Sequence, residues 1–263
     1  MDKETVIYAI ERADCILPPI DGYLEYLNID GVTVCVTPLP HSMANRVSNA
    51  RLDAISAEPK IREIKKVFTG QKKAFSWTVG PHSSPSHLGQ LLEGNGLEPT
   101  YGSDGMYMDI AGYEAKKYPG IKIIEVPADN PGEAVTIMVE GFGITEESSR
   151  FYHDMLYHSN KHLPCKIYIA YDKEDRAVGC CYMTYYPDQP VALLGGATTI
   201  PGYRGRGFYT AMLSYRMEDA RRDGMETVII IADRTSSAPI CRKNGFKKIC
   251  NMELYVCENE FPF

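Results

Sequence analysis

A short run rich in glycine and arginine is the segment of this sequence best suited to chemistry. It joins a predicted strand to a predicted helix and reads Thr199-Ile200-Pro201-Gly202-Tyr203-Arg204-Gly205-Arg206-Gly207-Phe208-Tyr209-Thr210-Ala211. Glycine adopts backbone conformations that other residues avoid, so such a turn can direct several amides to one point. The first N–H groups of a helix have no partner within it, and the helix dipole adds positive charge. The run therefore predicts a phosphate or pyrophosphate site, with two guanidinium groups beside it.

Other motifs that bind phosphate or nucleic acid fit this run less well. A Walker loop needs Gly-Lys-Ser or Gly-Lys-Thr, which the sequence lacks. The dinucleotide fingerprint needs a third glycine at the place of Thr210. A disordered Arg-Gly-rich RNA-binding tail would be repeated, whereas this run occurs once between periodic elements.

The elements around the run must position it, and their patterns are typical of a chain that alternates strands and helices. In chain order we predict a strand at 121–126, helices at 129–141 and 145–158, strands at 166–171, 177–186 and 191–200, a helix at 208–222, a strand at 227–232, a short helix at 239–244 and a strand at 246–257. The run lies between the third of these consecutive strands and the helix that follows it.

Length and composition indicate two modest domains. The chain has 263 residues, of which 44% are apolar, and at roughly 150 residues per domain this corresponds to about two domains. The segment 111–120 has little apolar periodicity and ends in Pro119-Gly120, so we expect a linker and a boundary near residue 115. Before it we predict strands at 32–37, 74–79 and 105–110 and helices at 59–68 and 86–93. Their order echoes the last third of the chain, which suggests a decayed internal repeat.

Charge and cysteine usage exclude several classes of protein. The net charge is −6, so a nucleic-acid partner is not expected. No apolar run approaches the ~20 residues of a membrane span, and no signal peptide is expected, so we predict a cytoplasmic protein without a membrane partner. The eight cysteines form no Cys-x-x-Cys pair, and His153, His158 and His162 lack companion ligands, so we predict free thiols and no metal.

At the glycine-arginine run the sequence resembles the GNAT superfamily of acyl-CoA-dependent N-acetyltransferases. The phosphate loop of that superfamily has Arg or Gln, two residues, Gly, one residue, and then Gly or Ala. Here Arg204, Gly207 and Tyr209 take those three places, so a tyrosine replaces the last small residue. The preceding Thr199-Ile200-Pro201 matches a strand that in the superfamily bulges and separates from its neighbour.

A second motif extends the resemblance over residues 119 to 263. Ala238, Cys241 and Gly245-Phe246 resemble the superfamily's Ala-x-x-x-Tyr-x-x-x-Gly-Phe, with one spacer fewer and a cysteine in the place of the tyrosine. The resemblance implies an α/β (α+β) acyl-CoA N-acyltransferase fold, whose mixed, mostly antiparallel sheet is flanked by helices. It also implies a catalytic domain at 116–263, preceded by a degenerate GNAT-like domain at 1–115 that lacks the glycine-arginine loop and should not bind CoA.

The resemblance also implies where acetyl-CoA, the co-substrate, would bind. Backbone amides from Arg204 to Tyr209 would hold its pyrophosphate, and its pantetheine arm would pair with the strand edge near Ala197 to Ile200. An N–H near Thr198 or Thr199 would polarise the thioester carbonyl. The full set of predicted cofactor-binding residues is Ala197, Thr198, Thr199, Ile200, Arg204, Gly205, Arg206, Gly207, Phe208, Tyr209, Thr210 and Ser237.

Proton transfer is the part of the chemistry for which the sequence leaves alternatives. The superfamily often uses a carboxylate on the bulged strand and the motif tyrosine, but residues 191–200 contain no Asp or Glu. Asp188, Asp233 or a water chain could serve as base. Cys241 could protonate the departing thiolate or simply pack a short helix, and Tyr203 is a further candidate.

The resemblance implies an N-acetyltransferase in which the acceptor amine attacks the thioester directly. The acceptor would be a small molecule or a peptide amine, and the first domain would shape its site or form a homodimer contact. The alternative is a CoA-binding sensor or interaction module that does not catalyse. A protein that binds neither is the third possibility.

Overall fold

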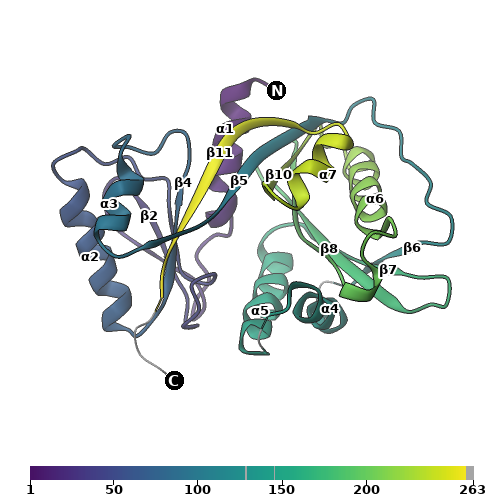
Figure 1. Cartoon of the computed structure of the whole chain (residues 1–263), viewed down its shortest axis with the longest axis horizontal. Helices are drawn as coiled ribbons and strands as arrows, with labels where there is room; N and C mark the ends of the chain where they lie inside the picture. Colours follow the sequence, from purple (N-terminus) through teal and green to yellow (C-terminus); the bar gives the residue numbers. More distant parts are fainter. Residues whose placement is uncertain (128, 145, 259–263) are drawn as a thin grey trace. The chain divides into compact units, whose positions relative to one another are not determined.

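The structure is a computed structural model that describes residues 1–127, 129–144 and 146–258. The chain forms two compact units (Figure 1). The glycine-loop unit contains Met106–Ile231 and Ile240–Lys247. The companion unit contains Asp2–Gly105, Ala232–Pro239 and the described residues from Lys248 onward.

The sheet of the glycine-loop unit is mixed and mostly antiparallel. Its strands lie in the order β10-β9-β8-β7-β6, and only β9 and β10 pair in parallel. The elements are β6 (Lys122–Val126), α4 (Gly132–Phe142), α5 (Glu146–His162), β7 (Cys165–Tyr171), β8 (Ala177–Tyr185), β9 (Val191–Thr199), a 3-10 turn (Pro201–Tyr203), α6 (Phe208–Arg222), β10 (Thr227–Asp233) and α7 (Ser237–Lys243). This is the arrangement that the resemblance implies, with the predicted start of α5, Thr145, lying outside the described residues.

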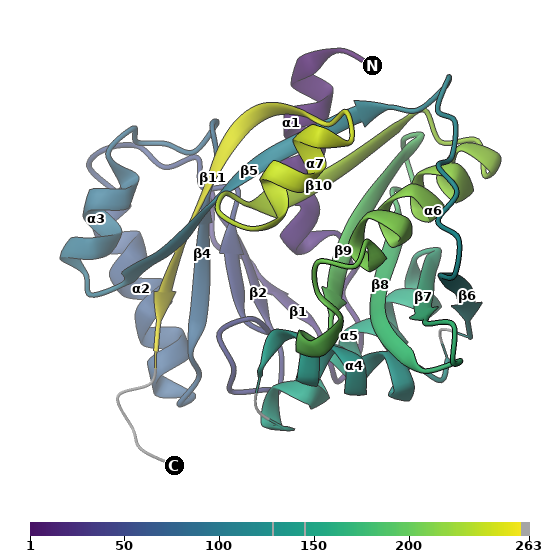
Figure 2. The same ribbon diagram turned by 45° about the vertical axis from the view of Figure 1, so that its right-hand side comes forward.

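Helices cover both faces of this sheet (Figure 2). On β8, the Cys180 thiol donates to the Ala134 carbonyl of α4 at 3.3 Å. Its neighbour Gly179 lies against Met212 of α6. Since adjacent residues of a strand face opposite sides, α4 and α6 pack on opposite faces of the sheet.

The companion unit has its own sheet and core. Its strands lie in the order β1-β2-β3-β4-β11-β5, and Trp77, Phe75 and Phe68 are fully buried in a core beneath them. The elements are α1 (Lys3–Arg12), a 3-10 turn (Ala13–Cys15), β1 (Glu25–Leu27), β2 (Thr33–Val36), β3 (Arg46–Ser48), α2 (Ala57–Gly70), β4 (Phe75–Val79), α3 (Leu88–Gly94), β5 (Glu98–Asp109) and β11 (Lys247–Cys257). The phenyl rings of Phe68 and Phe75 stack with centroids 4.5 Å apart, so α2 is anchored to β4.

The two units repeat one pattern of strand pairing. In the companion unit, β1 pairs with β2 and β2 with β3 in antiparallel, and β3 pairs with β4 in parallel after α2. In the glycine-loop unit, β7, β8, β9 and β10 pair in the same succession, with α6 as the crossover. This order is what an internal repeat would produce.

The chain passes between the units more than once. The sequence predicts one division near residue 115, whereas the units divide after Gly105, Ile231, Pro239 and Lys247. The difference arises because β11 pairs in antiparallel with β4, Glu253–Cys257 against Phe75–Val79, and so belongs to the companion unit. Strand pairing of this kind is nonlocal, and a local linker signal does not report it.

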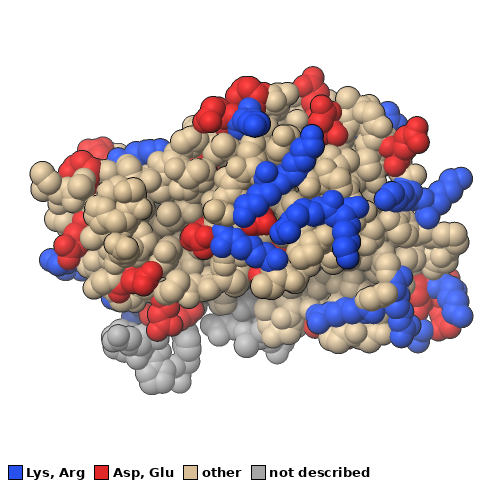
Figure 3. All heavy atoms as spheres, turned by 45° about the horizontal axis from the view of Figure 1, so that its top comes forward, with Lys and Arg blue, Asp and Glu red and all other residues tan. Residues whose placement is uncertain are grey.

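No helix among the described residues is long and apolar enough to span a bilayer. On the face shown in Figure 3, side chains of Lys and Arg and of Asp and Glu are both present.

Candidate functional site

The turn between β9 and α6 adopts the conformation for which its glycines are needed. Gly205 has φ +74° and Gly207 has φ +88°, both in the left-handed region that other residues rarely adopt. Gly207 is also the N-cap of α6, and no side chain caps that helix. The amides of the first turn are therefore left for another acceptor.

Most amides of this turn have no acceptor within the described structure. The Arg204 N–H donates to the Pro201 carbonyl at 3.3 Å, so this one amide is already used within the protein. The first helical bond runs from the Ala211 N–H to the Gly207 carbonyl at 2.9 Å. For the amides from Gly205 to Thr210, the described residues supply no acceptor. The turn can thus surround an anion with N–H groups.

The two arginines of the turn have different surroundings. The Arg204 guanidinium donates to the Thr199 carbonyl at 3.1 Å and to the Gly141 carbonyl at the end of α4, so it fastens the turn to β9 and α4. The Arg206 guanidinium lies over the Tyr203 ring, 5.0 Å from its centroid. Among the described residues no carboxylate forms an ion pair with Arg206. Of the two, Arg206 is the cation available to a ligand.

Strand β9 carries a bulge before it reaches the turn. Cys180 pairs with Thr198 and Tyr182 with Gly195, so β9 has one residue more than β8 between these pairs. Gly196, with φ +54°, lies within the bulge. A β-bulge leaves residues unpaired and bends the strand, which is the feature that the resemblance implies for this strand.

Beyond its start, β9 also leaves its other neighbour. Its parallel pairing with β10 covers Val191–Leu193 only, against Thr227–Ile229. From Leu194 to Thr199 the β10 side of β9 is consequently an unpaired edge among the described residues. An extended ligand can add to such an edge as a strand would.

Thr199 is the residue that this edge presents next to the turn. The Ile200 N–H donates to the Val178 carbonyl on the β8 side at 3.0 Å, so the Thr199 N–H points to the unpaired side. The Thr199 hydroxyl is buried, at 7% exposure, and has no hydrogen-bond partner in the described structure. Buried hydroxyls are normally paired, so a ligand group at this point would satisfy Thr199.

Tyr209 of the predicted phosphate loop, at the start of α6, lies beside Cys241 of the second motif, on α7. The hydroxyl of Tyr209 is 3.8 Å from the Cys241 sulfur. Cys241 is fully buried, and burial raises the pKa of its thiol above the ordinary value. Burial, together with the nearby thiol, also raises the pKa of Tyr209. Both groups therefore stay protonated at neutral pH.

The other predicted residues have local partners. The Asp233 carboxylate accepts hydrogen bonds from the backbone and hydroxyls of Thr235 and Ser236, and these bonds lower its pKa. Asp233 and Ser237 belong to the companion unit. Tyr203 lies in the turn itself, and the guanidinium groups of Arg176 and Arg206 lie 5.3 and 5.0 Å from the centroid of its ring.

The matching turn of the companion unit is closed by its own side chain. Between β3 and α2, the Asp53 carboxylate accepts from the N–H groups of Ile55 and Ser56, both at 2.9 Å. The Ser56 hydroxyl also donates to this carboxylate and, together with the two backbone bonds, lowers the pKa of Asp53, so it is ionised at neutral pH and repels anions. Only the glycine-loop unit has a turn of this kind with open amides among the described residues.

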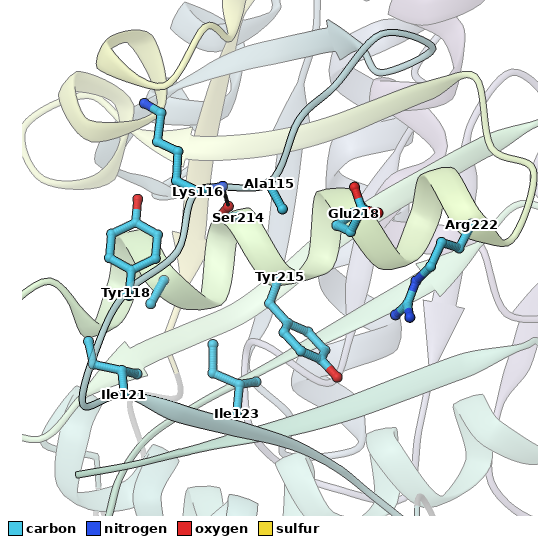
Figure 4. A pocket seen from close by; sticks show the side chains of 10 residues that line it. Ala115, Lys116, Tyr118, Ile121, Ile123, Ser214, Tyr215, Glu218 and Arg222 are labelled. Atoms are coloured by element: carbon cyan, nitrogen blue, oxygen red, sulfur yellow. Dashed lines mark hydrogen bonds between the residues drawn. The ribbon is translucent and has the colours of Figure 1, made fainter. Parts of the chain in front are cut away.

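A pocket of about 280 Å³ lies along α6 beside the turn (Figure 4). One wall of this pocket is formed by residues of the segment 111–120, which the sequence predicts as a linker. The Lys116 N–H and the Tyr113 hydroxyl both donate to the Ser214 hydroxyl of α6, at 3.0 and 2.8 Å. The segment is therefore fastened to the helix. The lining residues are Ala115, Lys116, Tyr118, Ile121, Ile123, Ala211, Ser214, Tyr215, Glu218 and Arg222.

Sequence reasoning missed two residues that contact the bulge from neighbouring elements, Tyr182 of β8 and Arg216 of α6. The Tyr182 ring packs against Gly195 and Gly196, where a Cβ atom would come within 2.3 and 2.4 Å of it. Arg216 of α6 is fully buried, and its guanidinium donates to the carbonyls of Tyr182 and Gly195. The Gly195-Gly196 pair was the only sequence signal for this packing.

Comparison with known proteins agrees with this geometry. Residues 134–246 match the acetyltransferase (GNAT) family. No match was found among curated proteins. A GCN5-related N-acetyltransferase from Kribbella flavida is similar in structure, with a TM-score of 0.69, 13% identity and 91% of each chain covered.

Two further solved structures show the same fold. One is a GCN5-related N-acetyltransferase from Sphaerobacter thermophilus, with a TM-score of 0.66, 15% identity, and 90% of this chain and 84% of that chain covered. The other is a tandem GNAT protein from the clavulanic acid biosynthesis pathway, with a TM-score of 0.63, 12% identity, and 98% and 89% covered. Residues 134–246, with their bulged strand and open glycine turn, therefore form a domain of the GNAT superfamily.

Proposed function

We propose that this protein transfers an acetyl group from acetyl-CoA to an amine. The observation that carries the proposal is the turn at 205–210, whose amides have no acceptor in the described structure, at the end of a strand edge that β10 leaves unpaired. An anion site and an unpaired strand edge meet there, which suits a diphosphate joined to an extended pantetheine arm.

The residues present fit that co-substrate. The amides from Gly205 to Thr210 and the Arg206 guanidinium would hold the diphosphate. The Thr199 N–H points to the unpaired edge of β9, where it would bind an amide carbonyl of the arm. The Thr199 carbonyl already accepts a hydrogen bond from the Arg204 guanidinium, so it is less available than the Thr199 N–H to a bound ligand.

The chain would then act by holding both substrates and by polarising the thioester. Alignment of two reactants in one site can supply a large part of the rate enhancement. The acceptor amine must lose a proton, and because β9 has no carboxylate we propose a water chain as the route, with Asp188 and Asp233 as the carboxylate alternatives. Cys241 stays protonated beside Tyr209, so this pair is the proposed proton source for the leaving thiolate.

A CoA-binding sensor is the second candidate. It is favoured by the missing carboxylate on β9 and by Tyr209, which takes the place of a small residue. A sensor would bind CoA or acetyl-CoA at the same turn, but no amine would accelerate release of the thiol.

Three further proposals concern the whole protein. We propose that it acts in the cytoplasm, that the companion unit shapes the acceptor site, and that a homodimer forms. Its acidic net charge of −6 favours cationic acceptors in general, although charge alone does not locate a pocket.

The test is thiol release from acetyl-CoA, followed with a thiol reagent in the presence of polyamines, aminoglycosides, small amines and peptide amino termini. We expect at least one class to accelerate release, and Arg206→Glu to abolish it. Tight CoA binding by calorimetry without turnover on any acceptor would favour the sensor. No heat with acetyl-CoA, and no effect of Arg206→Glu, would refute both.

A further inference from the structure

Arg216 is a cation buried in the core of the glycine-loop unit. It lies on α6 with no exposed surface. Its Nη1 donates to the carbonyl oxygens of Tyr182 at 3.0 Å and Gly195 at 3.3 Å, and its Nε donates to the Met212 carbonyl at 3.4 Å. Among the described residues no carboxylate pairs with it, and its Nη2 has no hydrogen-bond partner. A buried charge without a counter-ion is costly, so a role beyond packing would explain it.

One of the three carbonyls that Arg216 binds, that of Gly195, belongs to the peptide group at the centre of the bulge. The Gly195 C=O and the Gly196 N–H share one planar trans peptide, so they point in opposite directions. The Gly195 oxygen points to Arg216 together with the Tyr182 oxygen of β8. The Gly196 N–H therefore points away from Arg216, on a stretch of β9 that no longer pairs with β10.

The same contact makes this N–H a stronger donor. A guanidinium hydrogen bond to a carbonyl oxygen draws electron density from the peptide, and hydrogen bonds in such a chain strengthen one another. Gly196 is in register with no residue of β8, because the register shifts at the bulge. The Tyr182 ring packs against the Gly195 and Gly196 backbone and resists rotation of the peptide.

We propose that Arg216 is a positioning residue for acyl transfer: it orients and polarises the Gly195–Gly196 peptide so that the Gly196 N–H binds the thioester carbonyl oxygen. This inference rests on the proposed function. As the amine attacks, negative charge grows on that oxygen. A donor that is already in position stabilises the charged transition state more than it stabilises the bound thioester. Arg216 itself does not touch the substrate.

The test compares Arg216→Met and Arg216→Lys with Arg221→Met, an exposed arginine on the same helix that pairs with Glu218. Removal of one oxyanion donor typically costs about 10²–10³ in kcat. We expect kcat to fall at least about tenfold in Arg216→Met, with KM for acetyl-CoA and the Kd for CoA changed less than about threefold. Lysine keeps the charge but not the planar fork, so Arg216→Lys should lie between wild type and Arg216→Met. Arg221→Met should match wild type.

A second readout does not depend on turnover. The carbonyl stretching band of acetyl-CoA labelled with ¹³C at the carbonyl should shift to lower frequency on binding to wild type and return toward its free position in Arg216→Met. If the Met variant does not fold, Arg216→Lys carries the same comparison. An unchanged band in a folded variant, or kcat within twofold of wild type, would overturn the inference.

The two proposals fail separately. If wild type binds acetyl-CoA but acetylates no amine, the proposed transfer activity fails, while the carbonyl band still decides the role of Arg216. If wild type is active and the Arg216 variants are equally active, only the inference about Arg216 fails. If wild type does not bind acetyl-CoA, both fail.

Discussion

Gly207→Ala tests the open turn directly. The residue has φ +88°, and the nearest heavy atom to an added Cβ is the Ile121 Cδ1 at 4.0 Å. Space is therefore available, and the whole effect should come from the backbone. Left-handed conformation costs a non-glycine residue roughly 1–2 kcal/mol. If binding requires this conformation, the affinity for CoA should fall by a factor of about 5 to 30, since about 1.4 kcal/mol corresponds to tenfold.

The assay is calorimetric titration of CoA into matched alanine variants. Gly205→Ala should behave like Gly207→Ala, because it has φ +74° and open space around it. Gly202→Ala is the control: its surroundings are equally open, but its φ is not positive. We expect wild-type affinity for Gly202→Ala. If Gly207→Ala binds CoA as tightly as Gly202→Ala, the turn does not bind the diphosphate in the conformation described, and the reasoning is refuted.

Three further predictions concern affinity and stability. Arg206→Ala should weaken CoA binding by about 1.5–3 kcal/mol, as for a charged hydrogen bond. In the same titration, added salt should reduce the difference in CoA affinity between this variant and wild type. Gly141→Ala should lower the melting temperature although alanine favours helices by about 1 kcal/mol, because its Cβ would lie 2.4 Å from the Thr198 hydroxyl; a rise would contradict this. The hydrogen bond to Glu11 raises the pKa of His82, so protonated His82 stabilises the folded state. This contribution to the free energy of unfolding is fully present below pH ~6.5 and is lost as the pH rises through the raised pKa. Urea unfolding of His82→Gln should therefore lose that part of the pH dependence, and an unchanged profile would count against it.

Much of the glycine-loop unit could be predicted because its signals are local. The helix at 208–222 and the glycines before it were placed within a residue or two of α6 and its N-cap. Helix α1 was missed, although Asp2 is a typical N-cap whose carboxylate accepts from the Thr5 N–H at 3.0 Å. The helical spacing of the buried residues Val6, Ala9 and Ile10 is a second signal that could have found this helix.

The remaining features depend on contacts between distant residues. His82 binds Glu11 across 71 positions, and nothing near either residue indicates it. Arg216 reads as one more polar residue of an amphipathic helix, since only the fold shows that it faces the bulge and not solvent. The bulge itself was implied by the resemblance, but its place at Gly195 to Thr198 follows from the register with β8.

The pairing of β4 with β11 has a consequence for how the chain is made. Phe75–Val79 leaves the ribosome long before Glu253–Cys257, its partner in the companion sheet. During synthesis, this edge of β4 stays unpaired until almost all of the remaining polypeptide has been made. The strands β6 to β10 can pair with one another before that point. Fragments cut near residue 115 would separate β4 from β11 permanently, so the two halves should be tested by co-expression and not in isolation.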